Sequence, residues 1–244
     1  MIIDKNQLLR TKKEIREEIW TKMTQKKVGA FPFPLYGRIS NFLRANDAAQ
    51  RLFSLQIWEN AQYVKINPDS PQRWVRQRAL EEGKILYMAV PRLRSLKCFI
   101  RIQVPPQLAK KASSIRGAFK MGESLHPRAM RPIELVIMGS VAVNSYGERI
   151  GKGGGYGDLE LALAHKFHVL SPDTPIVTTV HDLQVTTERF RLTPHDALLD
   201  YIATPTKMIR CEEHSQKNLK IFWEALSSEQ IKKMPILNEL QKLS

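Results

Sequence analysis

Residues 133–158 read IELVIMGSVAVNSYGERIGKGGGYGD and give the clearest information on how the chain folds. Residues 133–143 form the longest apolar run in the sequence, which predicts a buried central strand. A glycine-rich turn follows, and the segment from Asp158 to Ala164 has the composition of a helix. A strand, a turn and a helix in this order are typical of α/β proteins that bind ligands at strand ends.

The rest of the chain continues this alternation. Short apolar runs predict further strands at residues 61–66, 84–90, 97–104, 175–180 and 201–204. Apolar residues at helical spacing predict helices at residues 12–27, 46–60 with Asn46 or Asp47 as the cap, 72–82, and a C-terminal pair over 212–243 with Leu219, Phe222, Trp223 and Leu226 on one face. We expect the segment 105–132, broken by Pro and Gly, to be mostly loop. The pattern predicts an α/β sandwich with a largely parallel sheet, built as one domain over residues 1–244.

Composition excludes several classes of protein. The chain has 244 residues, of which 43% are hydrophobic, so it can bury a core without covalent staples. Cys98 and Cys211 are far apart and lack metal-ligand spacing, which argues against a disulfide framework and a zinc site. The N-terminus has no apolar leader and no window approaches a membrane span. We therefore expect a cytoplasmic protein without a membrane partner.

The charge is unusual. Lys and Arg number 38 against 24 Asp and Glu, a net charge of +14, and residues 92–131 alone hold ten basic side chains and one acidic one. A basic chain favours anionic partners, which include nucleotides and nucleic acids. One interpretation is a basic wall lining one cleft; the alternative is scattered, solvated surface charge.

The segment from Gly147 to Asp158 carries the chemistry. Glycines let backbone N–H groups approach an anion, and the following helix N-terminus adds partial positive charge, so the segment indicates phosphate binding. Its spacing is neither that of a Walker A loop nor GxGxxG after a strand. A purely structural turn remains the alternative.

Charged residues around this loop sharpen the hypothesis. Arg149 and Lys152 lie on the loop, while Lys12 and Arg16 are one helical turn apart and could clamp a phosphate or merely form a solvated face. If phosphate binds close to Asp158, a cation such as Mg²⁺ must lie between the two negative charges. The alternative is that Asp158 is only an acid in the first turn of the helix, where the helix dipole stabilises it. Asp196 and Asp200 are candidates to complete the metal site, and Asp196 could instead cap a short helix.

Covalent catalysis has little support. Ser140 lies in Gly139-Ser140-Val141, which is not a GxSxG elbow. His181 sits at a predicted strand end, where it could act as a base or simply be a hydrogen-bonded loop residue.

Four blocks together resemble the 5-formyltetrahydrofolate cyclo-ligase family. They are Lys12 to Arg16, Gly83-Lys84 through Pro91, the loop from Gly147 to Asp158, and Asp196, Asp200 and Thr204. The resemblance covers most of the chain. It is nearest to the divergent branch of methenyltetrahydrofolate synthetase domain-containing proteins, on residues 64–72, 139–143 and 180–184.

The resemblance implies a Rossmann-like three-layer α/β/α sandwich and ATP- and Mg²⁺-dependent cyclisation of 5-formyltetrahydrofolate to 5,10-methenyltetrahydrofolate. It implies Lys152 and Arg149 as catalytic residues and Asp158 and Asp196 as the Mg²⁺ ligands. The ATP-binding residues that it implies are Lys12, Arg16, Arg149, Gly151, Lys152, Gly153, Gly154, Gly155 and Tyr156.

The sequence departs from the family pattern on the folate side. Gly157 replaces the second Tyr of the Tyr-Tyr-Asp motif, Leu159 follows the Asp, and residues 69–71 contain no Glu where the family has a folate-contacting one. The alternative function is therefore a non-catalytic nucleotide- or RNA-binding module that kept the fold and lost the folate site.

Overall fold

The structure, a computed structural model, describes residues 9–212 and 217–243, and its centre is an eight-stranded sheet. The strand order is β11-β10-β8-β5-β1-β2-β3-β4. The five inner strands from β10 to β2 are parallel, and the remaining edge strands are antiparallel to their neighbours. The strands are β1 (Tyr63–Ile66), β2 (Ile85–Ala89), β3 (Phe99–Ile102), β4 (Glu123–Leu125), β5 (Leu135–Met138), β8 (Ile176–Thr179), β10 (Tyr201–Ala203) and β11 (Met208–Arg210).

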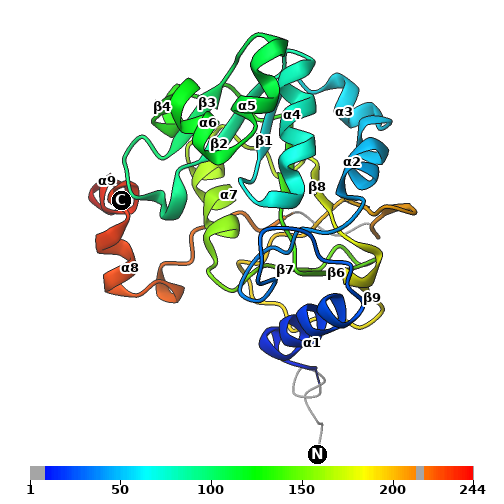
Figure 1. Cartoon of the computed structure of the whole chain (residues 1–244). Helices are drawn as coiled ribbons and strands as arrows, with labels where there is room; N and C mark the ends of the chain where they lie inside the picture. Colours follow the sequence, from blue (N-terminus) through cyan, green and yellow to red (C-terminus); the bar gives the residue numbers. More distant parts are fainter. Residues whose placement is uncertain (1–8, 213–216, 244) are drawn as a thin grey trace, which may run out of the picture.

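Helices cover both faces of this sheet (Figure 1). Side chains of β1 and β2 alternate between the two faces, so Val64 and Leu86 belong to one buried cluster and Tyr87 to the other. On the first face lie α2 (Ala45–Phe53), α3 (Gln56–Asn60), α4 (Arg73–Glu81), α5 (Ala109–Ala112) and α6 (Ile115–Met121). On the second lie α7 (Tyr156–Lys166), α8 (Ser228–Lys233) and α9 (Pro235–Leu243). The predicted α/β fold with a largely parallel sheet is confirmed.

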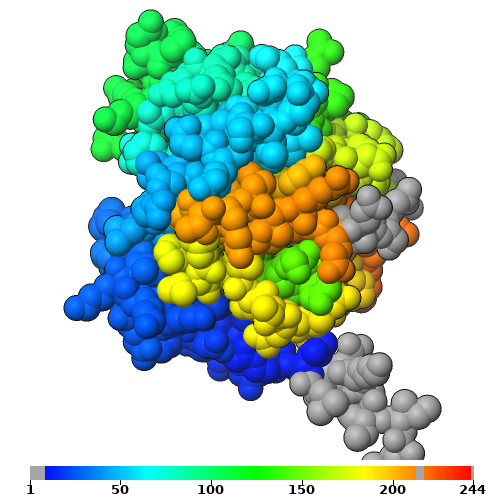
Figure 2. All heavy atoms as spheres, turned by 90° about the vertical axis from the view of Figure 1, so that its right-hand side faces the viewer, coloured from blue at the N-terminus to red at the C-terminus, as the bar shows by residue number. Residues whose placement is uncertain are grey.

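A second, three-stranded sheet carries the N-terminal helix. It consists of β7 (Arg149–Ile150), β6 (Ala142–Asn144) and β9 (Val185–Thr186), in that order. Helix α1 (Lys12–Gln25) packs Ile15, Ile19 and Trp20 against β6 and β7. In Figure 2, the blue N-terminal part and the yellow segment that contains β9 lie side by side below the orange β10 and β11. Helix α1 is thereby held beside the loop that follows β7.

Short 3-10 turns complete the secondary structure, and both cysteines are buried and unbonded. The turns are η2 (Ser70–Gln72), η3 (Pro91–Leu93), η4 (Pro106–Leu108), η5 (Pro127–Ala129), η6 (Asp182–Gln184) and η7 (Trp223–Ala225).

The long apolar run is not one strand, which corrects the prediction for residues 133–143. It divides at Gly139 into β5 of the large sheet and β6 of the small one. A Cβ at Gly139 would lie 2.7 Å from Asp69 Oδ2, so only glycine fits this close passage. Both halves are apolar because the sheets are buried on different partners, namely α7 and α1.

Two helix predictions also needed correction. The predicted helix over 46–60 is interrupted at Ser54, whose hydroxyl donates to the Arg51 carbonyl. Helix α2 begins directly after Arg44, whose backbone is in the left-handed region, and neither Asn46 nor Asp47 forms its cap. Helix α7 begins at Tyr156 instead of Asp158.

The segment 105–132 is not mostly loop. It forms η4, α5, α6, β4 and η5. Proline is tolerated in the first turn of a helix because the N–H it lacks has no intrahelical partner there, so Pro106 and Pro127 start helical turns. Ser114 caps α6 by accepting from the Gly117 N–H at 3.0 Å.

The C-terminal region differs in the same way. The predicted first helix, with Leu219, Phe222, Trp223 and Leu226 on one face, lies partly outside the described residues. Where it is described, it is irregular chain and one 3-10 turn. The helical pair is α8 and α9, which begin at Ser228 and Pro235.

Candidate functional site

A glycine-rich loop, residues 151–155, connects β7 to α7 beside the carboxyl ends of β1 and β5. Gly153 and Gly155 have φ values of +104° and +67°, in the left-handed region that favours glycine. The loop therefore presents an open backbone and the N-terminus of an eleven-residue helix to the same space. Gly154 lies against the ring of Tyr156, where a Cβ would be 3.0 Å from Cδ2.

Arg149 connects this loop to the large sheet. Its side chain is 5% exposed. One terminal nitrogen donates to both carboxylate oxygens of Asp158 at 2.8 Å, and the other donates to the Gly139 carbonyl at 2.9 Å. Asp158 also accepts from the Ala197 N–H. The buried guanidinium thus fixes α7, β5 and the loop before Asp200 relative to one another.

Helix α1 brings two more cations to the loop. The Arg16 guanidinium lies close enough to Gly153 that a Cβ there would meet Nη1 at 3.0 Å. Burial lowers the pKa of Arg16, and this guanidinium forms no hydrogen bond or ion pair with the described residues. Lys12, one turn earlier, forms an ion pair with Asp196. A charged, partly buried and unpaired group beside an open glycine loop is suited to an anion.

Lys152 is the most exposed of the four cations beside the glycine loop. Its side chain is half exposed, and Nζ lies 3.4 Å from Asp69 Oδ1. Asp69 is on the segment after β1, whose carbonyls at Asn67 and Asp69 accept hydrogen bonds from buried Arg76. Burial lowers the pKa of Arg76 to about 10, which still leaves it charged at neutral pH. Arg76 therefore fixes the position of the partner of Lys152.

Asp158 and Asp196 are each paired with a cation, Asp158 with Arg149 and Asp196 with Lys12. Asp196 uses Oδ2 to bind Lys12 and Thr193. Burial raises its pKa, but the bonds to Lys12 and Thr193 outweigh burial, so the net shift is downward and the group is ionised. Among the described residues there is no group of three His, Cys, Asp or Glu side chains arranged for a metal. Mg²⁺ commonly takes only one or two protein carboxylates together with substrate phosphates, so two carboxylates beside the glycine loop are compatible with it.

Three other predicted candidates are not part of this arrangement. Asp200 lies at the amino ends of β8 and β10, where it accepts from the Ile176 N–H and pairs with Lys217 at 2.8 Å. His181 caps η6 and accepts from the Leu183 N–H through Nδ1, as the structural alternative predicted. Ser140 is buried and bonded to Thr178. The alternative role of Asp196 as a helix cap is wrong, because residues 191–200 contain no helix.

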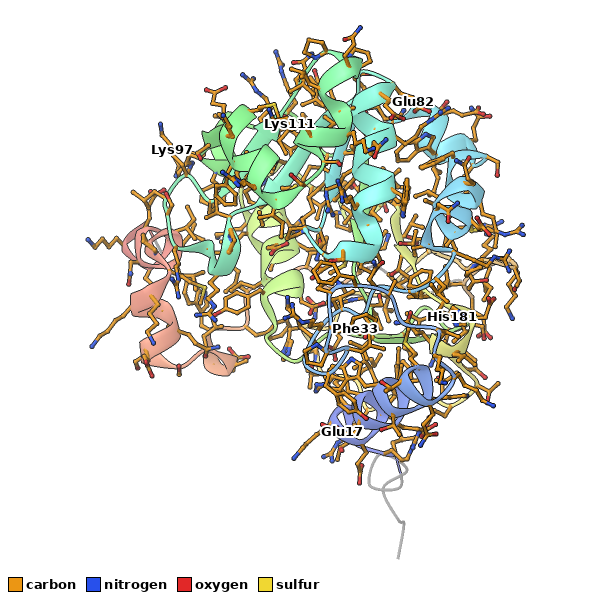
Figure 3. All side chains as sticks on the ribbon, viewed as in Figure 1. Glu17, Phe33, Glu82, Lys97, Lys111 and His181 are labelled. Carbon is orange, nitrogen blue, oxygen red and sulfur yellow. The ribbon has the colours of Figure 1, made fainter. Side chains whose placement is uncertain are left out.

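The basic segment 92–131 does not form a wall around the glycine loop. The cations that approach the loop come from α1 and from β7 and the loop itself. Lys97 and Lys111, by contrast, lie at the far end of the molecule from α1 (Figure 3). Of the ten basic residues, Lys110 lines a cavity beside the site.

That cavity, of about 470 Å³, opens next to the Lys152–Asp69 contact. Pro68 and Ser70, the neighbours of Asp69, form part of its wall. Phe31, Trp74 and Ile115 are its exposed apolar side chains, and Arg73, Arg76 and Lys110 are its cations. A cavity of this size and lining suits a planar, partly apolar ligand with negative groups. Sequence reasoning missed it because its walls come from four separate segments.

Sequence reasoning also missed a buried charge cluster beneath the loop. Lys65 is 1% exposed on β1, and its Nζ donates to Glu160 Oε2 at 2.6 Å and to Asn67 Oδ1 at 2.7 Å. The one signal in the sequence was a lysine within an apolar strand. Gly157 lies above this cluster, where a Cβ would meet Met138 Cε at 3.2 Å.

No helix among residues 9–212 and 217–243 has the length and apolar character needed to cross a bilayer.

Comparisons with known proteins agree with this geometry. The sequence model of the 5-formyltetrahydrofolate cyclo-ligase family matches residues 4–205. The chain is 39% identical over 236 residues to the methenyltetrahydrofolate synthase domain-containing protein of Bos taurus and 37% identical over 238 residues to that of Homo sapiens. These matches cover 95% of this chain but 62% and 61% of the relatives, so the chain spans about three fifths of their length.

A solved structure shares the fold. The NMR structure of Aquifex aeolicus 5,10-methenyltetrahydrofolate synthetase superposes with a TM-score of 0.54 at 17% identity. It covers 84% of this chain and 95% of its own. At this identity, the likeness supports the fold alone.

Proposed function

Since the chain belongs to the 5-formyltetrahydrofolate cyclo-ligase family, we propose that it catalyses the ATP- and Mg²⁺-dependent conversion of 5-formyltetrahydrofolate to 5,10-methenyltetrahydrofolate. In this reaction the formyl oxygen takes the γ-phosphoryl group, N10 attacks the activated carbon, and phosphate leaves. No covalent enzyme intermediate is needed. The task of the protein is to position two substrates and to neutralise charge.

The ATP phosphates would lie on residues 151–156. Backbone N–H groups of the loop and the N-terminus of α7 would bind their oxygens, and Arg16 would supply the first charged contact because it has no competing partner among the described residues. Lys12 would add a second cation from the same helix face. Asp158 and Asp196 would hold Mg²⁺, which supplies charge neutralisation at the β- and γ-phosphates.

Lys152 and Arg149 would have different roles. Lys152 is half exposed and lies between the loop and Asp69, so it can reach a phosphoryl group during transfer. Arg149 is already bonded to Asp158 and to Gly139, so it would act as a positioning residue that aims the Asp158 carboxylate. The structure thus favours Lys152 as the catalytic cation of the two.

The folate would occupy the cavity of about 470 Å³. Trp74 and Phe31 offer rings for the pterin, and Arg73 and Lys110 offer cations for the glutamate carboxylates, including those of a polyglutamate tail. The observation that carries the proposal is the contact of Lys152 with Asp69, since it connects the phosphate loop to the rim of this cavity.

The test is the appearance of methenyltetrahydrofolate absorbance when the protein is mixed with 5-formyltetrahydrofolate, ATP and Mg²⁺. We expect turnover that requires all three, and a loss of at least a hundredfold in Lys152→Met. The matched control is Lys13→Met, which removes an exposed lysine from α1 and is expected to leave turnover unchanged. Binding of ATP without any turnover would reject the proposed reaction.

A second candidate function is a non-catalytic nucleotide- or RNA-binding module. The observation that favours it is the segment 92–131, whose ten basic side chains are all exposed and among which only Arg101 has an ion pair, with Glu123, within the described part of the chain. Such a surface binds polyanions with a strong salt dependence. The test is the affinity for RNA as salt rises from roughly 50 to 200 mM, the range in which phosphate contacts are screened. If the affinity does not fall steeply, the RNA-binding function is excluded.

A further inference from the structure

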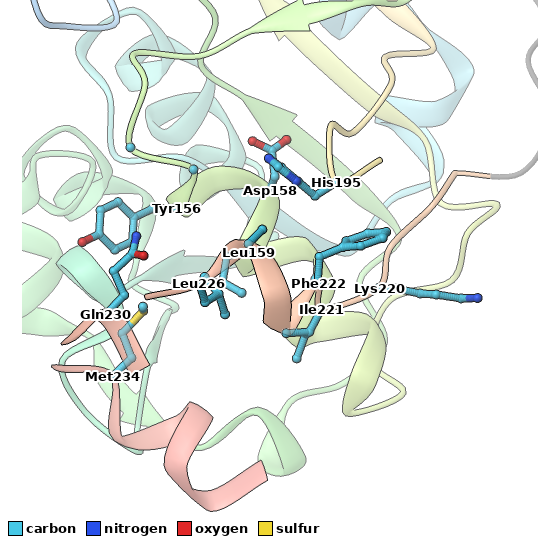
Figure 4. Close-up of a pocket in the computed structure, with 14 residues that line it drawn as sticks. Tyr156, Asp158, Leu159, His195, Lys220, Ile221, Phe222, Leu226, Gln230 and Met234 are labelled. Carbon is cyan, nitrogen blue, oxygen red and sulfur yellow. The ribbon is translucent and has the colours of Figure 1, made fainter. Parts of the chain in front are cut away.

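The C-terminal segment, residues 217–234, forms one wall of a pocket whose other wall is the glycine loop and α7. From α7 and the loop come Gly154, Gly155, Tyr156, Asp158, Leu159 and Ala162. Facing them are Lys220, Ile221, Phe222, Ala225, Leu226, Gln230 and Met234, with His195 beside Asp158 at one end (Figure 4). This segment lies beyond residues 4–205, the part matched by the family model.

The segment is firmly attached to the body of the protein. Lys217 is 8% exposed, pairs with Asp200 at 2.8 Å and donates to the Thr174 carbonyl at 2.9 Å. Leu219 and Met234 are buried in the core cluster that also contains Leu161 and Leu163 of α7. Both ends of residues 217–234 are therefore fixed, and the pocket between them is a built feature.

The pocket has the size and lining for a planar heterocycle. Its volume is about 100 Å³, several times the roughly 10–15 Å³ that a single water needs, so it can admit a small flat ring. Leu159, Ile221 and Leu226 make its centre apolar, and Tyr156 and Phe222 flank it (Figure 4). Gln230 Oε1 is engaged in the cap of α8, whereas its amide N–H₂ has no partner among the described residues and faces the pocket side of the helix. That amide can donate to a ring nitrogen or carbonyl.

The position of the pocket identifies its occupant. Gly154 and Gly155 belong both to the pocket rim and to the glycine loop, and Asp158, also on the rim, follows in the first turn of α7. A ligand with its phosphates on the loop would have its nucleoside end within reach of this pocket. We propose that residues 217–234 form the base-binding wall of the nucleotide site, so that this added segment takes the nucleobase of the nucleoside triphosphate whose phosphates lie on the glycine loop.

This inference rests on the proposed nucleotide function, and its test separates the two. Mg²⁺–ATP and Mg²⁺–tripolyphosphate are titrated into the same protein by calorimetry, because both carry the triphosphate but only ATP carries a base. The variant Ala225→Trp fills the pocket from an exposed position on η7. The matched control is Ser228→Trp, which adds the same ring nearby on an exposed residue outside the pocket lining.

We expect the wild type to bind ATP at least tenfold more tightly than tripolyphosphate. In Ala225→Trp, ATP affinity should fall to the level of tripolyphosphate, tripolyphosphate affinity should not change, and Ser228→Trp should match the wild type. If Ala225→Trp binds ATP as tightly as the wild type does, the pocket assignment is wrong while the phosphate site stands. If the wild type binds neither ligand, the proposed function fails, and the base-binding wall fails with it.

Discussion

The Arg149–Asp158 pair connects the stability of the fold to the geometry of the site, and Arg149→Met isolates its contribution. The substitution keeps an unbranched apolar stem of similar reach but removes the guanidinium. It leaves Asp158, whose side chain is 11% exposed, with only the Ala197 N–H as a partner in the described structure, and it leaves the Gly139 carbonyl without its donor. Removing one partner of a buried pair costs about 3–5 kcal/mol because the other charge stays buried.

The same substitution at an exposed pair provides the comparison. Arg101 and Glu123 are 2.6 Å apart, but their side chains are 45% and 59% exposed. Exposed pairs contribute about 0–1 kcal/mol. We therefore expect Arg149→Met to lower the free energy of unfolding by about 3–5 kcal/mol, while Arg101→Met lowers it by less than about 1 kcal/mol.

Urea unfolding followed by tryptophan fluorescence and far-ultraviolet circular dichroism measures both changes. The double variant Arg149→Met/Asp158→Leu removes the stranded charge, so it should recover a large part of the loss. Equal effects of Arg149→Met and Arg101→Met would refute the reasoning, since burial would then make no difference. A double variant less stable than Arg149→Met alone would also refute it, because the loss could not come from an unpaired carboxylate.

Three further predictions concern the site and its pH dependence. Because the pKa of Asp196 is lowered from 3.8 in the folded state, its pairing stabilises the protein above about pH 4, and this contribution is lost as pH falls through the lowered pKa. Lys12→Met should therefore be less stable than the wild type at about pH 7, and the difference should shrink steadily as pH falls below about 4 in urea unfolding. Gly153→Ala should weaken tripolyphosphate binding about tenfold in calorimetry, because φ is +104° and the new Cβ would lie 3.0 Å from a guanidinium nitrogen of Arg16. The control is Gly37→Ala, where φ is +73° and the space around the new Cβ is open. It should lower stability by a similar amount, about 1 kcal/mol, and leave tripolyphosphate binding unchanged. Trp74→Ala should weaken folate binding by about tenfold, roughly the worth of one aromatic stack, and leave ATP binding unchanged; equal loss of both ligands in equilibrium dialysis would place the folate elsewhere.

Local sequence was sufficient for the backbone of the glycine loop and for one face of α1. Lys12 and Arg16 are one turn apart on the same helix, and Gly153 and Gly155 allow the left-handed backbone of the loop. That both elements bind ATP is implied by the family resemblance and stays a prediction; the structure places them side by side, since a Cβ at Gly153 would lie 3.0 Å from Arg16 Nη1. Charge counting was less successful, because a net charge of +9 over residues 92–131 says nothing about which way the segment faces.

Tertiary contacts explain the features that sequence reasoning missed. The apolar run at 133–143 gave no hint of two strands, since burial against α7 and burial against α1 select the same residue types. The break depends on Asp69 and on Arg149, which approach Gly139 from distant parts of the chain. The spacing of Asp196 and Asp200 suggests a shared site, but the extended chain between them places Asp200 at the amino ends of β8 and β10.

The changes on the folate side and the added C-terminal segment are connected through α7. Where the family motif has a second Tyr, Gly157 lies directly over Met138 and Asn67, and Lys65 ties Asn67 to Glu160 of the same helix. This buried cluster closes the inner face of α7, so a pterin cannot be contacted there by a side chain at position 157. The outer face is covered by residues 217–234. On the proposed function, the nucleobase would use the pocket that remains between this segment and α7, and a folate would approach from the Trp74 side, past Asp69 and Lys152. Both proposed substrates would then meet at Lys152, which lies between the glycine loop and the rim of the cavity beside Asp69.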